Sequence, residues 1–198
     1  MDAMSYIEAA QERREKGGMV GATWGLPALD RRTGGIWGEK LIVVAGRPSV
    51  GKTAFALNAA LSGRAKVGII SLEMGTDELG IRSIANLLDV NGTALSFADP
   101  HTLETTNQRA QNRTINDRNI WVDDSTYGLN QIVSRITEWR RKHDIDYAIV
   151  DHIGLIEGNN GHTRNDWLGD VSRTLKKTAK RLEMPIIALS QLNRAARS

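Results

Sequence analysis

The sequence predicts an α/β fold in which a mainly parallel sheet is covered by helices on both faces. Five short runs are rich in Ile and Val and lack polar alternation, which is typical of strands buried on both sides. Helical stretches separate these runs, and strand-helix alternation favours parallel pairing. The expected strands are residues 40–46, 66–74, 119–124, 146–151 and 185–191, and the expected helices start at Lys52 or cover 76–88, 129–143 and about 166–182.

The length and composition of the chain exclude several classes of protein. The 198 residues suit one domain, 40% of them are hydrophobic, and the absence of cysteine excludes disulfides and thiolate metal sites. No apolar run approaches the roughly 18 residues that a membrane span requires. The net charge of +3 is weak support for a polyanionic partner. We therefore expect no membrane association.

The chain divides into a short leader and a core. Residues 1–18 predict a charged linker helix that ends at Gly17 and Gly18, and residues 19–198 predict the globular core. The thin apolar stripe of the leader is compatible with a solvated helix. It is equally compatible with a helix that packs on a neighbouring subunit.

The segment GRPSVGKT lies between the first expected strand and the first expected helix. This is the spacing of a P-loop, in which glycines allow backbone N–H groups to approach phosphate oxygens and the helix N-terminus faces the anion. We expect Lys52 to reach the β- and γ-phosphates and the Thr53 hydroxyl to bind Mg²⁺. The predicted nucleotide-binding residues are Gly46, Arg47, Pro48, Ser49, Val50, Gly51, Lys52 and Thr53.

Three further polar residues end buried runs and should face the same edge of a parallel sheet. Asp151 ends YAIVD, where a carboxylate would hold Mg²⁺ through water. Glu73 in IISLEM is placed to orient or deprotonate the attacking water, although an acid before a helix also favours the helix dipole. Gln191 in ALSQ could sense the γ-phosphate, since an amide both donates and accepts hydrogen bonds.

Several segments in this order resemble the motor domain of DnaB-type replicative DNA helicases, which has the RecA-like fold. The resemblance runs from about Gly25 to Arg194 and is strongest in RPSVGKTAFALNAA, IISLEM, YAIVDHIGLIEG and ALSQLNR. It implies that Glu73 is the catalytic glutamate, that Asp151 is the metal-side acid and that Gln191 is the γ-phosphate sensor. It also implies an ATP-dependent DNA helicase, with ATP and Mg²⁺ as cofactors, that translocates on single-stranded DNA and unwinds duplex.

The same resemblance implies the setting of the protein. Members form hexameric rings, so we expect a homo-hexamer of the full-length protein around single-stranded DNA, with primase and a helicase loader as further partners. The expected location is the cytoplasm of a bacterial or phage-infected cell.

Two features depart from the family pattern. His152 and Gly154 follow Asp151 where bacterial members usually have an aromatic residue and then Gln, which is closer to phage helicase-primases. The sequence stops at Ser198, whereas the family motor continues with a DNA-binding pore loop and an arginine finger. Arg194 and Arg197 come too early to match that finger. We therefore expect this chain to bind nucleotide well and to hydrolyse it poorly.

Other interpretations remain at this point. A different RecA-like ATPase, such as a RadA-like recombination factor or a KaiC-like switch, shares the P-loop and the segment before it. A nucleotide-binding assembly module with little turnover is also compatible with the short chain. A small-molecule phosphotransferase fits less well, because no arginine-rich lid is evident between the third and fourth strands.

Overall fold

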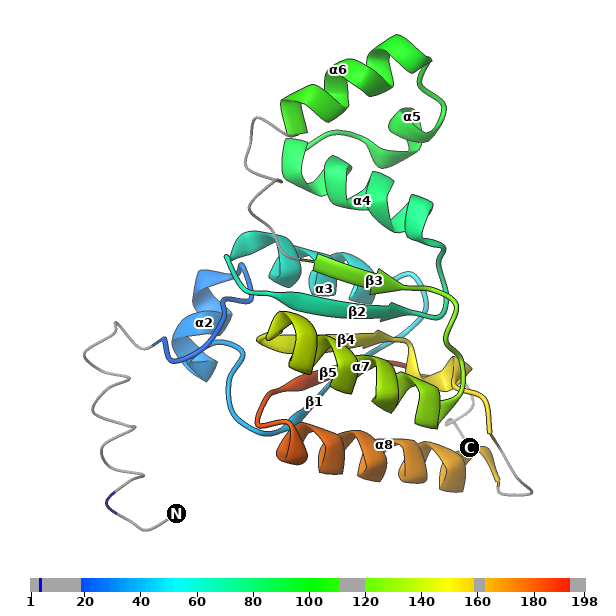
Figure 1. The fold of residues 1–198 in the computed structure, drawn as a ribbon. Coiled ribbons are helices and arrows are strands. Elements are labelled where there is room, and N and C mark those ends of the chain that lie inside the picture. The colour runs from blue at the N-terminus through cyan, green and yellow to red at the C-terminus, as the bar shows by residue number, and fades with distance from the viewer. Residues whose placement is uncertain (1–3, 5–18, 111–119, 159–162, 193–198) are drawn as a thin grey trace, which may run out of the picture.

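A computed structural model of the protein describes residues 4, 19–110, 120–158 and 163–192. Its centre is a five-stranded sheet in the order β1-β5-β4-β2-β3, and every pairing is parallel (Figure 1). The strands are β1 (Leu41–Gly46), β2 (Val67–Ser71), β3 (Ile120–Asp123), β4 (Tyr147–Asp151) and β5 (Ile186–Gln191). The predicted α/β fold with a parallel sheet is confirmed, and all five strands lie within their predicted ranges.

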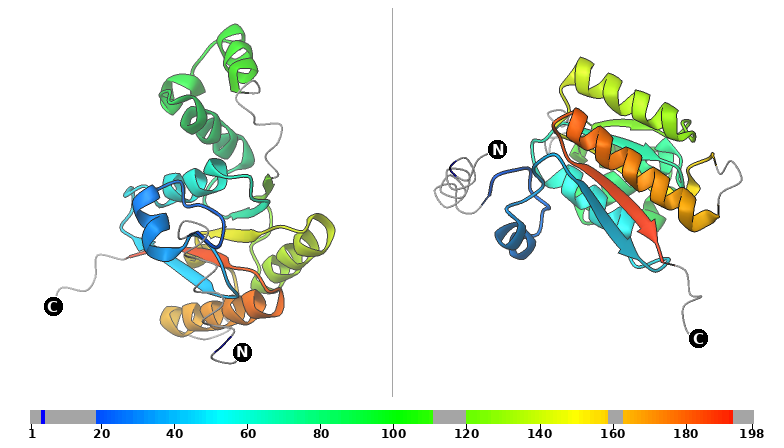
Figure 2. Two further views of the ribbon diagram at one scale, coloured as in Figure 1. Left: turned by 90° about the vertical axis from the view of Figure 1, so that its left-hand side faces the viewer. Right: turned by 90° about the horizontal axis from the view of Figure 1, so that it is seen from below.

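The helices cover both faces of this sheet, as predicted (Figures 1 and 2). The elements are α2 (Pro27–Thr33), α3 (Lys52–Ser62), α4 (Thr76–Leu88), α5 (Gly92–Ser96), α6 (Pro100–Ala110), α7 (Leu129–His143), the 3-10 helix η2 (Ile153–Leu155) and α8 (Arg164–Arg181). Helices α4 and α7 have the predicted bounds, and α8 begins two residues before the expected start. The expected leader helix lies outside the described residues apart from Met4.

The α-helices α2, α5 and α6 and the 3-10 helix η2 were not predicted from the sequence. Helix α2 has only seven residues, although Pro27 at its first position and the left-handed Gly34 at its end are ordinary boundary signals. Helices α5 and α6 lie in a polar stretch that shows no clear apolar stripe, and they project from the sheet together with α4 (Figure 1). Their helical state is decided mainly by packing and by caps such as Asn91, whose side chain accepts from the amides of Thr93 and Ala94.

The core consists of two apolar layers, one on each face of the sheet. Alternate residues of a strand point to opposite faces, so Ala148 and Val150 of β4 join one layer and Ile149 joins the other. Helices α7 and α8 pack on the first layer through Ile132, Ile136, Trp139, Val171, Leu175 and Ala179. Helix α3 packs on the second through Ala56, Leu57, Ala59, Ala60 and Leu61. Burial on both faces explains why the strands lack polar alternation.

The strand register brings the carboxyl ends of four strands to one edge. Gly46 of β1 pairs with Gln191 of β5, and Ser71 of β2 pairs with Asp151 of β4. The amide of Leu192 then donates to the carbonyl of Gly46 at 3.0 Å, which ties the end of β5 to the start of the P-loop. Polar residues that are far apart in the sequence therefore meet at this edge.

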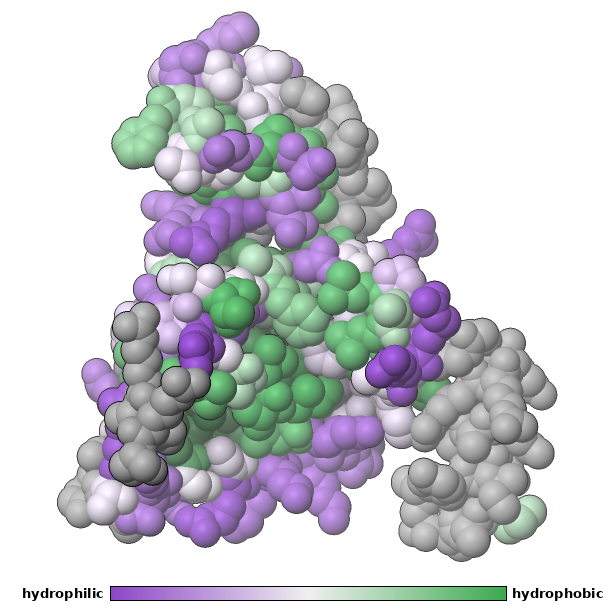
Figure 3. Space-filling model, turned by 180° about the vertical axis from the view of Figure 1, so that it is seen from behind, coloured by the Kyte–Doolittle hydropathy of each residue, from purple (hydrophilic) through white to green (hydrophobic). Residues whose placement is uncertain are grey.

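Apolar and hydrophilic side chains occupy different regions of the surface. Viewed from behind, apolar side chains gather in the middle of the face and hydrophilic side chains form its lower rim (Figure 3). Within the described residues β1 pairs only with β5, and its Val43 is 51% exposed. None of the helices in the described part of the chain is long and apolar enough to cross a membrane.

Candidate nucleotide-binding site

The P-loop connects β1 to α3, as the sequence predicts. Gly51 has φ +91°, a left-handed conformation that residues with a side chain rarely adopt, and it directly precedes α3. A Cβ at Gly46 would lie 2.6 Å from the Val50 Cγ1 atom, so a larger residue there would displace the Val50 side chain. The loop therefore turns sharply, and the unpaired N–H groups at the start of α3 face the edge of the sheet.

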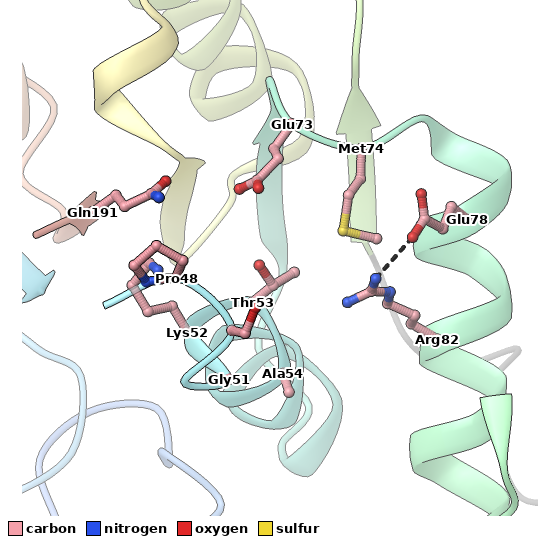
Figure 4. Close-up of a pocket in the computed structure, with 11 residues that line it drawn as sticks. Pro48, Gly51, Lys52, Thr53, Ala54, Glu73, Met74, Glu78, Arg82 and Gln191 are labelled. Atoms are coloured by element: carbon pink, nitrogen blue, oxygen red, sulfur yellow. Dashed lines mark hydrogen bonds and ion pairs between the residues drawn. The ribbon is translucent and has the colours of Figure 1, made fainter. Parts of the chain in front are cut away.

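A cavity of about 540 Å³ opens above this loop. In Figure 4, side chains from the P-loop, from the β2–α4 turn, from α4 and from the end of β5 border the same space. The lining residues are Pro48, Ser49, Gly51, Lys52, Thr53, Ala54, Glu73, Met74, Glu78, Arg82 and Gln191. Five of the eight predicted nucleotide-binding residues, the predicted catalytic glutamate and the predicted sensor thus share one cavity.

Four predicted residues do not line the cavity. Gly46 and Val50 shape the loop from outside, and the Val50 residue is 64% exposed. Arg47 contributes its carbonyl, which accepts from Lys52 Nζ at 3.2 Å. Asp151 is buried, and it accepts a hydrogen bond from Thr53, which does line the cavity. The roles predicted for these residues stay predictions.

Asp151 is the most unusual acid of the site. It is 3% exposed, its Oδ2 accepts a 2.6 Å hydrogen bond from Thr53 Oγ1, and its buried Oδ1 has no hydrogen-bond partner within the described ranges. Burial raises the pKa of this carboxyl, because the ion loses its hydration, and the Thr53 hydrogen bond opposes that rise. A cation close to the free Oδ1 atom would stabilise the charged form of this carboxyl.

The Thr53 hydroxyl and the Asp151 carboxylate are suitable ligands for Mg²⁺. A hydroxyl and a carboxylate are hard oxygen ligands, and Mg²⁺ in phosphate sites usually keeps waters and phosphate oxygens as its other ligands. No cluster of three or more His, Cys, Asp or Glu residues suited to a metal occurs in the part of the chain that the structure describes. Thr53 and Asp151 would therefore hold the ion together with water and nucleotide.

The position of Glu73 differs slightly from the prediction, which placed it at the end of a strand. It lies two residues beyond the end of β2, in the turn before α4, and its side chain is 52% exposed. The carboxylate points into the cavity from the side opposite Gly51 (Figure 4). Its Oε2 atom lies 3.8 Å from Nε2 of His152, a buried residue that follows Asp151.

Sequence reasoning missed the contribution of α4. Glu78 and Arg82 line the cavity one turn apart and form an ion pair of 2.8 Å in which both side chains are half exposed. The signal was present, since an acid and a base at i and i+4 follow the strand that leads to Glu73. That spacing indicates only a helix face, and the packing of α4 beside α3 turns this face toward the P-loop.

Comparison with known proteins identifies the family of the chain. The family model for the DnaB-like helicase C terminal domain matches residues 21–198. The chain belongs to this family. Replicative DNA helicase DnaB of Rickettsia prowazekii is 33% identical over 210 residues, which cover 98% of this chain and 43% of the relative.

Solved structures of DnaB-like proteins have the same RecA-like fold. One is described as an ATPase domain and another as a DnaB-like replicative helicase with its interactions with primase. Each has a TM-score of 0.79 and 29% sequence identity, and each alignment covers 98% of this chain. The alignments cover 73% and 49% of those two chains. The chain spans between 35% and 43% of the length of the curated relatives that it matches.

Proposed function

We propose that this DnaB-like domain binds ATP with Mg²⁺ and is the motor of a replicative DNA helicase. The observation that supports it best is that the P-loop leads into α3, where the Thr53 hydroxyl donates a hydrogen bond to the buried Asp151. Lys52 and the N-terminus of α3 would hold the phosphates, and Thr53 and Asp151 would hold the metal.

Glu73 is the proposed general base for ATP hydrolysis. Its carboxylate enters the cavity beside the P-loop, where it could accept a proton from a water near the γ-phosphate. Gln191 borders the same space at the end of β5 and would sense whether that phosphate is present. Loss of the phosphate would then alter the segment that follows Gln191.

Single-stranded DNA is the proposed track of this motor. The family is one of replicative helicases, and the proposed assembly is a homo-hexamer of the full-length protein, with ATP at subunit interfaces. A structure similar to this one concerns interactions with primase, which supports primase as a partner, and a helicase loader is a further proposed partner. The proposed location is the cytoplasm of a bacterial or phage-infected cell.

The exposed basic residues of α8 are a further candidate surface for DNA. They are Arg173, Lys176, Lys177, Lys180 and Arg181. An amphipathic helix commonly carries such residues simply because that face meets water. Their contribution to DNA binding would appear as a steep dependence on salt, because phosphate contacts release counterions.

ATP turnover at low salt, with and without single-stranded DNA, tests the proposed function. Lys52→Ala should reduce turnover by about 10² or more, because a charge that stabilises the transferring phosphoryl group is lost. Lys142→Ala is the matched control, since the exposed Lys142 lies on α7 and pairs with the partly exposed Glu138. Turnover that survives Lys52→Ala, or that is absent in the native chain, would contradict the proposed hydrolysis.

A further inference from the structure

His152 directly follows Asp151 and is buried. It is only 5% exposed, and it does not line the nucleotide cavity itself. It instead lines a separate cavity of about 220 Å³ that also includes Ser190 and Gln191. A buried imidazole here has polar atoms on both sides, so its hydrogen bonds decide its orientation.

The backbone determines which ring nitrogen carries the proton. The amide of Gly154 donates to His152 Nδ1 at 3.1 Å. A ring nitrogen that accepts a hydrogen bond has no proton of its own, so the proton is on Nε2. His152 therefore presents an N–H donor on the side away from Gly154.

Glu73 is the acid near that donor. The Nε2 atom lies 3.8 Å from Glu73 Oε2, just beyond hydrogen-bond range. The His152 side chain is 7% exposed, whereas that of Glu73 is 52% exposed. The imidazole is thus the fixed partner, and a small torsional change in the freer glutamate would close the gap.

Gly154 makes this arrangement sterically allowed. A Cβ at residue 154 would lie 2.9 Å from both Nδ1 and Cε1 of His152, closer than real contacts of this kind. The ring can lie against the backbone only because that atom is missing. The carbonyl of Gly154 also accepts a hydrogen bond from Arg164 Nη2 at 3.4 Å.

We propose that His152 is a positioning residue that holds the carboxylate of Glu73 toward the γ-phosphate side of the cavity. The inference rests on the proposed function, because it assumes that Glu73 activates water. A half-exposed carboxylate samples several rotamers, and only some of them direct an oxygen at the attacking water. A fixed donor raises the population of the productive one.

Two substitutions of His152 by amide side chains test the roles of the two ring nitrogens separately. In His152→Gln the amide nitrogen can take the place of Nε2 and keep a donor toward Glu73. In His152→Asn the shorter side chain can still accept from the Gly154 amide, but no donor reaches Glu73. We expect His152→Asn to lower kcat for ATP by roughly tenfold, with KM and nucleotide affinity nearly unchanged, and His152→Gln to retain most of kcat.

Gly154→Ala is an independent test that keeps the imidazole. The added methyl group should push the ring off the Gly154 amide and lower kcat in the same way as His152→Asn. Equal kcat in the native chain and His152→Asn would overturn the proposal. So would a parallel fall in kcat and melting temperature for both Gln and Asn, because that outcome indicates a purely structural role.

A spectroscopic measurement does not depend on turnover. Nitrogen-15 chemical shifts of the His152 ring, assigned through the signal missing in His152→Asn, should show the proton on Nε2. A proton on Nδ1 would overturn the inference and leave the proposed function intact. If Glu73→Gln leaves turnover unchanged, or if the native chain has none, the proposed function fails and the positioning role fails with it.

Discussion

Thr53 donates a 2.6 Å hydrogen bond to Asp151 although the two residues are 98 positions apart in the sequence. The bond joins the start of α3 to the end of β4, and it occupies only one carboxylate oxygen. The other oxygen is buried and has no hydrogen-bond partner among the residues that the structure describes. The pair is therefore the proposed site of a divalent cation beside the P-loop.

Asp151→Asn should separate metal binding from folding. Without the carboxylate, Mg²⁺-dependent ATP turnover should fall by about 10² or more, since the charge that holds the ion is lost. The buried carboxyl also has a raised pKa. Its contribution to stability is present below its unfolded pKa of about 3.9 and is lost as pH rises through the folded pKa.

Without metal, the Asp151→Asn variant should therefore be more stable than the native chain at pH 7. This difference in stability should vanish toward pH 4. Thermal unfolding in EDTA between pH 4 and 8 checks this. Addition of Mg²⁺ and ATP should raise the melting temperature of the native chain far more than that of the variant. A variant that is less stable at every pH would show that the Asp151 carboxylate is satisfied without a metal.

Asp123→Asn should show the opposite pH dependence. Asp123 is 7% exposed, and burial acts to raise its pKa, but hydrogen bonds from Ser125, Thr126 and Arg135 outweigh burial and lower it. Stability from Asp123 is thus present above its unfolded pKa and is lost as pH falls through the folded pKa. The variant should lose about 1–3 kcal/mol at pH 7, measured by urea unfolding, and the loss should shrink below about pH 4.

The neighbouring acid is a matched control for that measurement. Asp124 bonds to the amide and the hydroxyl of Thr76 at the more exposed start of α4. Asp124→Asn should destabilise the protein less than Asp123→Asn. A similar loss for both variants would mean that the Arg135 ion pair adds nothing specific.

Tyr147→Phe should leave the protein equally stable or more stable. Tyr147 is fully buried, and its hydroxyl has no hydrogen-bond partner within the described part of the chain. The same burial raises the pKa of the phenol, so the group stays neutral at ordinary pH. Removing the unpaired hydroxyl should raise the free energy of unfolding by zero to about 2 kcal/mol in urea titrations. A clear loss would point to a partner such as a buried water.

Two glycines with open space around them should respond oppositely to alanine. Apart from its chain neighbours and, for Gly169, the backbone of its own helix, a Cβ built on Gly51 or on Gly169 would meet no described atom within 4 Å, but only Gly51 has a positive φ. Gly169→Ala in α8 should stabilise by roughly 0.5–1 kcal/mol through lower unfolded-state entropy. Gly51→Ala should cost about 1–2 kcal/mol because L-residues are strained in that conformation.

Denaturant midpoints of the two variants measure this difference. If Gly51→Ala were as stable as Gly169→Ala, the left-handed turn that opens the P-loop would not be a requirement of the fold. If both variants were destabilised, space would matter more than backbone conformation at these positions.

Local signals determined most of the elements. Ile and Val runs predicted every strand of the described sheet, because burial on both faces leaves no room for polar alternation. The spacing of Gly46, Gly51, Lys52 and Thr53 predicted the P-loop, because phosphate binding needs those residue types within one turn of the chain. The helical spacing of apolar residues predicted α4 and α7 with the bounds that the structure has.

Tertiary structure decided what those elements bring together. The strand order sets Gly46 beside Gln191 and Ser71 beside Asp151, and no local pattern states which strands are neighbours. The bond from Thr53 to Asp151, the entry of Arg82 into the cavity and the approach of His152 to Glu73 all depend on that order. Residue spacing predicts the conformation of one segment. The site forms by packing between several segments, and only the folded sheet places these segments side by side.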